Sequence, residues 1–460
     1  MKAPFDISGD LNTPVSAFMK LAPFRPRFLL ESVEGGERLG RYSFIGFGEA
    51  LDLRLDAHGL RFDGARLPAP ANAAELLEVM RAALAAAPKP RPAGSGIPLA
   101  GGLVGYAGYD LVRLFERLPA RRAAPGAALM HYVAPESLLV FDHVTRRIAL
   151  LHAGDDAERA RLRSEIVRAL QGAVPAQGTR RGFERPTAGL ERPGFLDSVR
   201  RAREHIAAGD IYQLVLSIRF EGRHDLDPFE VYRALRAINP SPYLFYCTLD
   251  DLTVIGSSPE ALVKLSDGVA GLRPIAGTRP RAESEAIDRA LEAELLADAK
   301  ENAEHVMLVD LARNDLGRVA ESGSVRVAPY RTIERYSHVM HLVSGVSGRL
   351  APGCDAFDLF AAAFPAGTLV GAPKVRAMQI IDELEPSGRG LYGGTVGYFG
   401  LRGDMDQAIT IRTLVFQGDH YSYQAGAGIV SDSDPAAEHA EILSKGAALL
   451  RALELAESGL

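Results

Sequence analysis

The order of hydrophobic and polar positions predicts paired strands and long helices. Short apolar runs near the start, such as "FLLES" and "YSFIGF", are separated by turn residues, as in strands with one buried face. The run "ESLLVFDHVTRRIALLH" predicts a β-hairpin, and residues 156–171 after it predict a helix. Strand pairs and helices without regular βαβ alternation indicate an α+β fold, in which packed antiparallel sheets carry helices on the outside.

The second half of the chain also shows predicted strands and helices. Residues 195–209 predict a helix with apolar positions on one face, and one long helix is predicted around residues 284–312. Residues 406–416, "DQAITIRTLVF", predict a single strand, and residues 420–430, "HYSYQAGAGIV", predict another.

The distribution of Pro, Gly and polar residues divides the chain into two large parts. Residues 171–194 are rich in these residue types and predict a connector. We therefore expect an N-terminal part, 1–170, and a C-terminal part, 195–457.

Composition narrows the class of protein. The 460 residues are 47% hydrophobic and 24% charged, which is typical of a globular protein, and no apolar run has membrane-spanning length. A net charge of −6 with scattered basic residues gives no footprint for nucleic acid. Two distant cysteines without metal-ligand spacing favour a reducing compartment, so a cytoplasmic location is expected.

Two pairs of glutamates have the spacing of one helical turn. Glu438 and Glu441 lie on one helix face with Lys445, and Glu301 and Glu304 form a second pair. The commoner use of such spacing is an exposed salt-bridge ladder. Two carboxylate pairs on two helices could instead hold Mg²⁺, which prefers oxygen ligands and completes its shell with water and an anionic ligand.

Nearby residues are suited to binding such an anion. Gly426 and Gly428 would let backbone N–H groups approach an oxyanion, although a tight turn or bulge would also explain them. Arg412, between apolar residues, can bind a carboxylate through two parallel hydrogen bonds.

Longer motifs carry a resemblance to a known family. They include "NPSPYLFY", "GSSPEALVKL", "RPIAGTRPR" and "FPAGTLVGAPKVRAM", together with "QAGAGIVSDSDPAAEHAEILSKG" near the end. With these motifs the chain resembles the chorismate-utilising enzymes, and among them the large subunits, or component I, of anthranilate synthases. The resemblance covers nearly the whole chain and implies the fold of that family.

The resemblance implies a site for chorismate, a dianion, and Mg²⁺. Glu304 and Glu441 match metal ligands, with Glu301 and Glu438 close by. Positions that match substrate contacts are Gly277, Thr278, Thr368, Tyr392, Arg412, Gly426, Ala427, Gly428 and Lys445. Holding both carboxylates of the substrate would supply catalysis through orientation.

The resemblance also implies a reaction in two steps. Ammonia adds at ring C2 as the C4 hydroxyl leaves, and pyruvate is then eliminated. Glu260 matches the acid that protonates the leaving hydroxyl, for which it must hold a proton near neutral pH. His341 matches the base at C2, while His338 is expected to be structural. A hydrogen-bonded core histidine is the alternative for His341.

Two positions separate the members of the family. Aminodeoxychorismate synthases typically carry a nucleophilic lysine where this chain has Ala276. Isochorismate and salicylate synthases carry a water-activating lysine where this chain has Gln213, whose amide cannot act as a base. These two residues favour anthranilate synthase. Aminodeoxychorismate synthase component I and a non-catalytic tryptophan-binding subunit are the alternatives.

The resemblance further implies partners and an inhibitor. Neither cysteine lies in the context of a glutaminase nucleophile, so ammonia is expected from a separate glutamine amidotransferase subunit in a hetero-oligomer. The segments "FLLES" and "NPSPYL" match a tryptophan feedback site. Its expected contacts are Ser32, Pro242, Tyr243 and Leu244.

Overall fold

The fold is seen in a computed structural model that describes residues 4–32, 40–92, 96–119, 128–175, 182–282, 284–335 and 339–459. Its helices are α1 Pro14–Lys20, α2 Ala73–Ala86, α3 Asp156–Gln171, α4 Arg192–Ala207, α5 Pro228–Ile238, α6 Glu285–Ala297, α7 Ala299–Gly317, α8 Ala356–Ala363, α9 Lys374–Leu384 and α10 Pro435–Ser458. Across these described ranges, no helix has both the length and the apolar character needed to span a membrane.

The strands of the N-terminal part are β1 Ile7–Ser8, β2 Phe28–Glu31, β3 Tyr42–Asp56, β4 Gly59–Phe62, β5 Ala65–Leu67, β6 Gly102–Ala107, β7 Met130–Asp142 and β8 Arg147–His152. The remaining strands are β9 Thr187–Ala188, β10 Gln213–Arg223, β11 Tyr243–Leu249, β12 Leu252–Ser258, β13 Ala261–Ser266, β14 Val269–Leu272, β15 Ile275–Pro280, β16 Arg326–Val327, β17 Thr332–Arg335, β18 Val339–Val343, β19 Val346–Arg349, β20 Gly371–Ala372, β21 Thr395–Gly400, β22 Met405–Ile409, β23 Thr413–Gln417 and β24 His420–Ile429.

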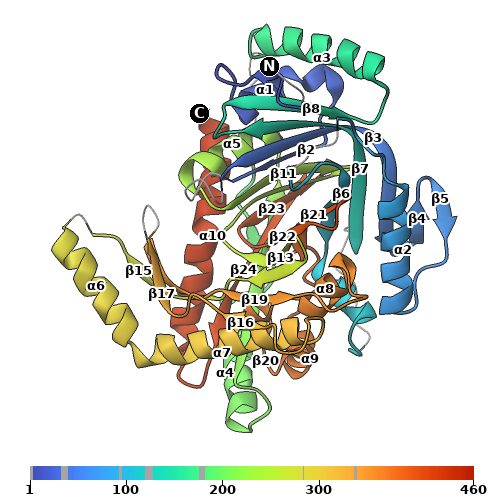
Figure 1. Ribbon diagram of the computed structural model, residues 1–460. Helices are drawn as coiled ribbons and strands as arrows, with labels where there is room; N and C mark the ends of the chain where they lie inside the picture. The colour runs from blue at the N-terminus through green and yellow to red at the C-terminus, as the bar shows by residue number, and fades with distance from the viewer. Residues whose placement is uncertain are drawn as a thin grey trace.

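Antiparallel pairing connects 21 of these strands into one hydrogen-bonded system, and helices lie around it (Figure 1). This arrangement confirms the expected α+β fold with antiparallel sheets and outer helices. The predicted hairpin is β7–β8, in which Leu138 pairs with Leu151, and the predicted helix 156–171 is α3.

The two parts of the chain share this sheet system. Strand β2 pairs with β11, and β6 pairs with β21, so residues from 1–170 lie beside strands of 195–457. Within the expected connector, the described residues 182–194 contain β9, which pairs with β10, and the first turn of α4. Strand pairing thus joins the two parts of the chain that composition separates.

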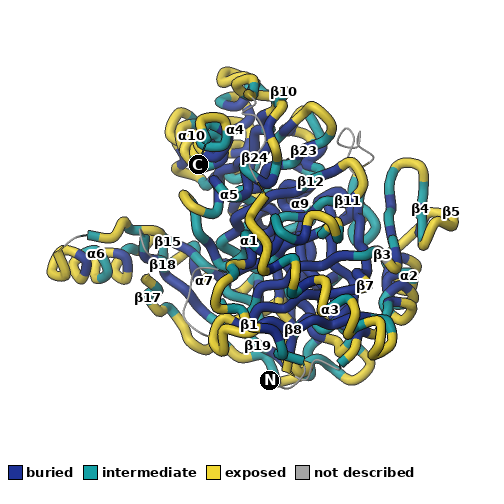
Figure 2. Tube along the Cα trace, turned by 90° about the horizontal axis from the view of Figure 1, so that it is seen from above, coloured by how far each residue is buried: buried dark blue, intermediate teal, exposed yellow. Residues whose placement is uncertain are grey.

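A smaller sheet of β15, β18 and β17 lies beside the main system, with α6 next to it. Figure 2 shows exposed residues along α6, whereas the strands in the middle of the molecule are almost wholly buried. Strand β7 is buried on nearly every residue of both faces, as expected of a strand enclosed between layers.

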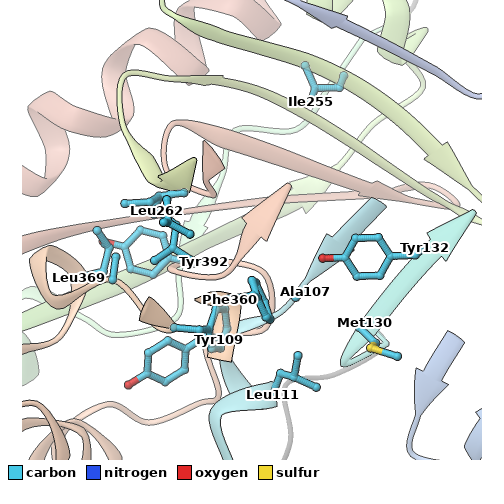
Figure 3. Close-up of a cluster of buried hydrophobic side chains, with 14 of the residues drawn as sticks. Ala107, Tyr109, Leu111, Met130, Tyr132, Ile255, Leu262, Phe360, Leu369 and Tyr392 are labelled. Atoms are coloured by element: carbon cyan, nitrogen blue, oxygen red, sulfur yellow. The ribbon is translucent and has the colours of Figure 1, made fainter. Parts of the chain in front are cut away.

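The main hydrophobic core extends to the residues that line the candidate site. Leu262, Leu369 and Tyr392 lie together at one side of the cluster in Figure 3, with Tyr109 near them. Because a close-packed core resists displacement, it fixes the backbone from which the site residues project.

The prediction of one long helix around residues 284–312 is wrong. The structure has two helices, α6 and α7, which are interrupted at Asp298. The backbone of Asp298 is extended, and its carboxylate accepts hydrogen bonds from the N–H groups of Lys300 at 3.0 Å and Glu301 at 3.1 Å. The aspartate therefore caps a new helix rather than continuing the old one.

Candidate active site

A carboxylic acid lies in the connection between β12 and β13. The hydroxyl of Thr368, in a 3₁₀ turn at Gly367–Leu369, donates a hydrogen bond of 3.0 Å to Oε1 of Glu260. A cavity of about 40 Å³ beside these two residues is lined by apolar side chains that include Leu308 and Leu311. Burial raises the pKa of Glu260 to about 7, while the Thr368 hydroxyl and the charge of Arg412 act against this shift. Glu260 is thus a carboxyl group that can hold a proton near neutral pH.

Arg412 lies at a sharp bend, and the prediction of one strand over residues 406–416 is wrong. The segment forms β22 and β23, and Arg412 between them has a left-handed backbone with φ of 49°. Its carbonyl accepts a hydrogen bond of 3.2 Å from the N–H of Ser257. The charge of Arg412 acts on the pKa of both Glu260 and His341, so the bend places a cation near both candidate catalytic groups.

His341 lies on β18, opposite Thr278 of β15. Its Nδ1 is 3.0 Å from the carbonyl oxygen of Gly277 and 3.1 Å from the Thr278 hydroxyl. A carbonyl only accepts, so Nδ1 carries the proton and the basic lone pair is on Nε2. Burial lowers the pKa of His341, with partial opposition from the Gly277 carbonyl, which favours the neutral, basic form. His338 lies outside the described residues.

Gly277 connects this histidine to the acidic helix α7. The β15–β18 register shifts between Ala276 and Thr278, and Gly277 at the shift has a φ of +62°. A side chain there would approach Glu301 Oε2 to 3.1 Å and Leu295 to 2.6 Å. The position therefore requires glycine, both for its backbone and for the close approach of α7.

Glu301 and Glu304 occupy the first turns of α7, where Asp298 begins the helix. Burial raises the pKa of Glu301, and the charge of Glu304 adds to the effect. The amide of Gln213, at the start of β10, donates a hydrogen bond of 3.3 Å to Oε1 of Glu304. Gln213 thus contacts one of the expected metal ligands.

The second acidic pair lies near the start of α10. Burial raises the pKa of Glu438, and the nearby charge of Glu441 adds to this effect, whereas a hydrogen bond from Ser433 opposes it. Lys445 Nζ lies 2.7 Å from Oε1 of Glu441 and donates a hydrogen bond of 3.1 Å to the Gly426 carbonyl. The charge of Lys300, on α7, also acts on Glu438, so the beginnings of the two helices are electrostatically linked.

The glycines of "QAGAG" belong to β24 rather than to a turn. Gly426 pairs with Ser217, Ala427 with Leu216 and Gly428 with Val215 on β10. A side chain at Gly426 would approach the Tyr392 hydroxyl to 2.5 Å, and one at Gly428 would approach the Gln213 amide to 2.8 Å. These glycines leave room on one sheet face for the side chains of Tyr392 and Gln213.

The four glutamates provide a suitable donor set for a dication, because each pair contains a partly buried carboxylate whose pKa is raised by burial and, further, by its like-charged neighbour. Over the described ranges, no three of their side chains bring ligand oxygens within 4.8 Å of one another. This spacing agrees with mutual repulsion and with the pairing of Glu441 to Lys445.

Asp52, His131 and Asp250 do meet the 4.8 Å criterion, but they lie in another part of the fold. Arg54 pairs with Asp250 at 2.8 Å and His131 with Asp52 at 2.5 Å, so each member of the cluster already has a partner.

Sequence reasoning missed a buried ion pair beneath the site. Arg389, 1% exposed, pairs with Glu385 at 2.7 Å and lies 5.6 Å from the ring of Tyr392. Its guanidinium also donates to the carbonyls of Leu369 and Val215, at 2.6 and 2.8 Å. The i,i+4 spacing was the available signal, but "EPSGRG" has the composition of a loop.

The four residues expected at a feedback site line one cavity of about 490 Å³, distant in sequence from the acidic helices. Ser32 follows β2, whereas Pro242, Tyr243 and Leu244 lie at the start of β11, and Glu31 of β2 pairs with Leu244. The cavity wall also includes Phe44, Tyr398 and Asp406 from other strands. The structure therefore brings all four predicted residues together.

Comparison with known proteins identifies the family. Residues 25–451 match the family model of the chorismate binding enzymes. The chain is 46% identical to anthranilate synthase component 1 of Thermus thermophilus over 98% of this chain and 97% of that protein. It is also 46% identical to the Streptomyces coelicolor protein of that name, over 98% and 88% of the two chains.

Solved structures agree with this match. The crystal structure of anthranilate synthase component I from Streptococcus pneumoniae superposes with a TM-score of 0.80 and 34% identity, and the match covers 98% of this chain and 100% of that one. A menaquinone-specific isochorismate synthase from Escherichia coli shares the fold, with a TM-score of 0.71 at 20% identity over 95% and 91% of the chains. The chain belongs to the chorismate-binding enzyme family and, within it, to the anthranilate synthase component 1 proteins.

Proposed function

We propose that this chain is the magnesium-dependent large subunit of an anthranilate synthase, a lyase that converts chorismate and ammonia to anthranilate, pyruvate and water. The observation that carries the proposal is the grouping of Glu260, Arg412 and His341, because the charge of Arg412 acts on the pKa of both other residues. By the family resemblance, Ala276 and Gln213 stand where other members carry lysines. An alanine cannot form a covalent adduct, and the Gln213 amide, which donates to Glu304, cannot activate water as a base.

Glu260 is suited to the first step. Addition of ammonia at C2 expels the C4 hydroxyl, which is a poor leaving group unless it is protonated. A carboxyl group with a pKa of about 7 holds a proton at neutral pH and can deliver it to the departing oxygen as water forms. The hydrogen bond from Thr368 to Oε1 fixes the orientation of the carboxyl group.

His341 is suited to the second step. Removal of the C2 proton and departure of pyruvate give the aromatic ring. Because Nδ1 donates to the Gly277 carbonyl, the basic lone pair is on Nε2, and the lowered pKa keeps the imidazole unprotonated before it acts. Arg412, whose charge acts on both groups, is suited to holding a carboxylate of chorismate between them.

Glu304 and Glu441 would hold Mg²⁺, with Glu301 and Glu438 beside it through water. The ion would supply positive charge for the ring carboxylate of chorismate. One partly buried carboxylate in each pair, Glu301 on α7 and Glu438 on α10, supports this assignment, because the like charges of each pair would be stabilised by a shared cation. With Glu441 as a ligand of the ion, the ammonium of Lys445, which lies beside it, would be available to bind a substrate oxygen.

Ammonia would come from a separate glutamine amidotransferase subunit, as the word component in the relatives' names suggests. The cysteines of the chain support this division of labour. Cys247 is 1% exposed, and burial raises its pKa to about 12, which disfavours the thiolate. Burial and two nearby aspartates also raise the pKa of Cys354.

The 490 Å³ cavity would bind tryptophan as an inhibitor. Its apolar and aromatic wall suits an indole ring, and two polar atoms in the wall suit an amino acid. The Ser32 hydroxyl and Oδ1 of Asp406 are buried without hydrogen-bond partners among the residues that the structure describes. A buried polar group without a partner is unfavourable, so a bound ligand would stabilise both.

Product analysis tests this function. The purified chain is supplied with chorismate, Mg²⁺ and an ammonium salt, and each component is omitted in turn. We expect anthranilate and pyruvate in equal amounts, only with all three present. Aminodeoxychorismate without pyruvate would instead indicate aminodeoxychorismate synthase. Tryptophan binding without turnover under any ammonia source would indicate a non-catalytic subunit.

A further inference from the structure

A buried ion pair joins two sides of the candidate site. One side is the 3₁₀ turn at Gly367–Leu369, whose Thr368 hydroxyl contacts the proposed acid. The other side is formed by β10 and β24, and β24 carries the glycines proposed to bind chorismate. Arg389 and Glu385, 1% and 6% exposed, contact both sides through the hydrogen bonds described below. We call Arg389 and Glu385 the buried pair.

The arginine of the buried pair bonds to both sides. Its Nη1 donates a hydrogen bond of 2.6 Å to the carbonyl of Leu369, the residue after Thr368, and its Nη2 donates one of 2.8 Å to the carbonyl of Val215 on β10. Val215 pairs with Gly428 in the register of the sheet. One planar group therefore fixes the spacing between the turn that contacts Glu260 and the strand beside Gly428.

The glutamate of the buried pair bonds to the second side. Its Oε1 accepts hydrogen bonds from the Ser217 N–H at 2.9 Å and from the Ser217 hydroxyl at 2.6 Å. Gln424 of β24 donates to the same hydroxyl at 2.8 Å. Ser217 pairs with Gly426, whose carbonyl accepts a hydrogen bond from Lys445. The carboxylate thus holds β10 and β24 at the second of the proposed substrate glycines.

The contact within the buried pair has a fixed geometry. Nε and Nη2 of Arg389 donate to the two carboxylate oxygens of Glu385 at 3.0 and 2.7 Å, as two parallel hydrogen bonds. The guanidinium also lies 4.9 Å from the ring centre of Tyr109 and 5.6 Å from that of Tyr392. Because desolvation offsets much of the attraction between two buried charges, such a pair adds little stability over packed apolar side chains. What the pair supplies at this place is orientation.

We propose that both members of the buried pair are positioning residues, which hold the Thr368 hydroxyl on Glu260 and keep the substrate glycines of β24 at a fixed distance from that acid. The proposal rests on the proposed function, which assigns the acid and the substrate site. Each member should then control a different property. Loss of the arginine contact at Leu369 should release Thr368 and raise the pKa of Glu260. Loss of the serine contact should displace β10 and β24 and weaken chorismate binding.

Arg389→Lys tests the arginine, because a single ammonium keeps the charge but cannot reach two carbonyls and a carboxylate as a planar fork does. The pKa of Glu260 is measured by carbon-13 NMR of glutamate-labelled protein, with Glu260→Gln to assign the signal, so the readout needs no turnover. We expect a rise of about half to one pH unit, as in Thr368→Val, and no further rise in the double variant. Arg159→Lys on α3, where the arginine also bonds a carbonyl and a carboxylate, is the matched control and should leave the pKa unchanged.

Ser217→Ala tests the glutamate, because it removes one contact of Glu385 and keeps the N–H contact beside it. It should raise the KM for chorismate about 3- to 10-fold and leave the pKa of Glu260 in place. Ser137→Ala, which removes another buried strand hydroxyl, bonded to His152 in the N-terminal part, is the matched control and should keep the parental KM.

An unchanged pKa of Glu260 in folded Arg389→Lys would overturn the proposal, as would a rise that adds in full to that of Thr368→Val. An unchanged KM in Ser217→Ala would also overturn it. If thermal unfolding shows that Arg389→Lys does not fold, the result for Ser217→Ala decides alone. A parent chain that forms no anthranilate would instead reject the proposed function, and the NMR titration would still decide whether Arg389 acts on Glu260 through Thr368.

Discussion

The Thr368 hydroxyl donates a hydrogen bond of 3.0 Å to Oε1 of Glu260, a carboxyl group whose pKa burial raises to about 7. The hydrogen bond favours the ionised carboxylate, and burial favours the protonated acid. The two residues come from segments more than a hundred positions apart. Burial raises the pH at which the proposed acid loses its proton, and this contact lowers it.

Removal of that hydrogen bond should shift the pH profile. The acid acts only when protonated, so kcat should fall as pH rises through about 7. Thr368→Val removes a donor to the ionised form, so the pKa should rise and the alkaline limb should move up by about half to one pH unit. The profile is measured at a saturating concentration of free ammonia at each pH.

Thr187→Val, on the exposed strand β9, is the control for this substitution and should leave the limb in place. Glu260→Gln should lower kcat by about 10²- to 10⁴-fold and abolish the limb. A downward movement of the limb in Thr368→Val would contradict the assignment of Glu260.

Substitution of the proposed base should separate the two steps. In His341→Asn the amide cannot accept the C2 proton, so aminated, non-aromatic product should accumulate and pyruvate release should fall by about 10²- to 10⁴-fold. Chromatography with mass detection follows both species. His439→Asn on α10 is a matched control and should retain full pyruvate release. Equal loss of amination and pyruvate release in His341→Asn would place the histidine in the first step instead.

The Ser32 hydroxyl, which is buried without a hydrogen-bond partner among the described residues, predicts a contribution to tryptophan binding. Ser32→Ala removes a possible partner for the amino acid and should weaken binding by about 3- to 10-fold, as expected for one neutral hydrogen bond. Tryptophan fluorescence reports the dissociation constant. Ser8→Ala, on strand β1 outside the cavity, should leave it unchanged. Tighter binding by Ser32→Ala would show that the hydroxyl has no ligand partner.

Much of the fold followed from local pattern. Helix α3 matches its prediction because Asp155 and Glu158 form a capping box, and Ile166 and Leu170 give it a buried face. Asp298 and Arg412 lay inside segments predicted as one helix and one strand, so the cap at Asp298 and the bend at Arg412 were not predicted. In both cases backbone geometry at one residue overrode the surrounding pattern.

The candidate site shows the same limit. The glutamate pairs were visible because both members lie on one helix, one turn apart. Contacts such as Gln213 with Glu304, or Arg389 with the Val215 carbonyl, join residues distant in sequence. They form because the fold places β10 beside α7 and beside the segment that follows α9. Residue identity indicated the chemistry, and tertiary structure determined which groups meet.

The central claim is that α7 and α10 share one Mg²⁺ through Glu304 and Glu441. Glu304→Gln, Glu441→Gln and the double variant form a thermodynamic cycle, in which the readout is the Mg²⁺ concentration for half-maximal anthranilate formation. Glu204→Gln, exposed on α4, is the matched control for loss of a carboxylate and should behave as the parent.

The most direct measurement is the coupling between the two glutamates in this cycle. Each single variant should need at least about tenfold more Mg²⁺. If both carboxylates bind one ion, the double variant should depart from the product of the single effects by about fivefold or more. Single effects that multiply within about twofold, or a parental Mg²⁺ requirement in either single variant, would contradict a shared ion.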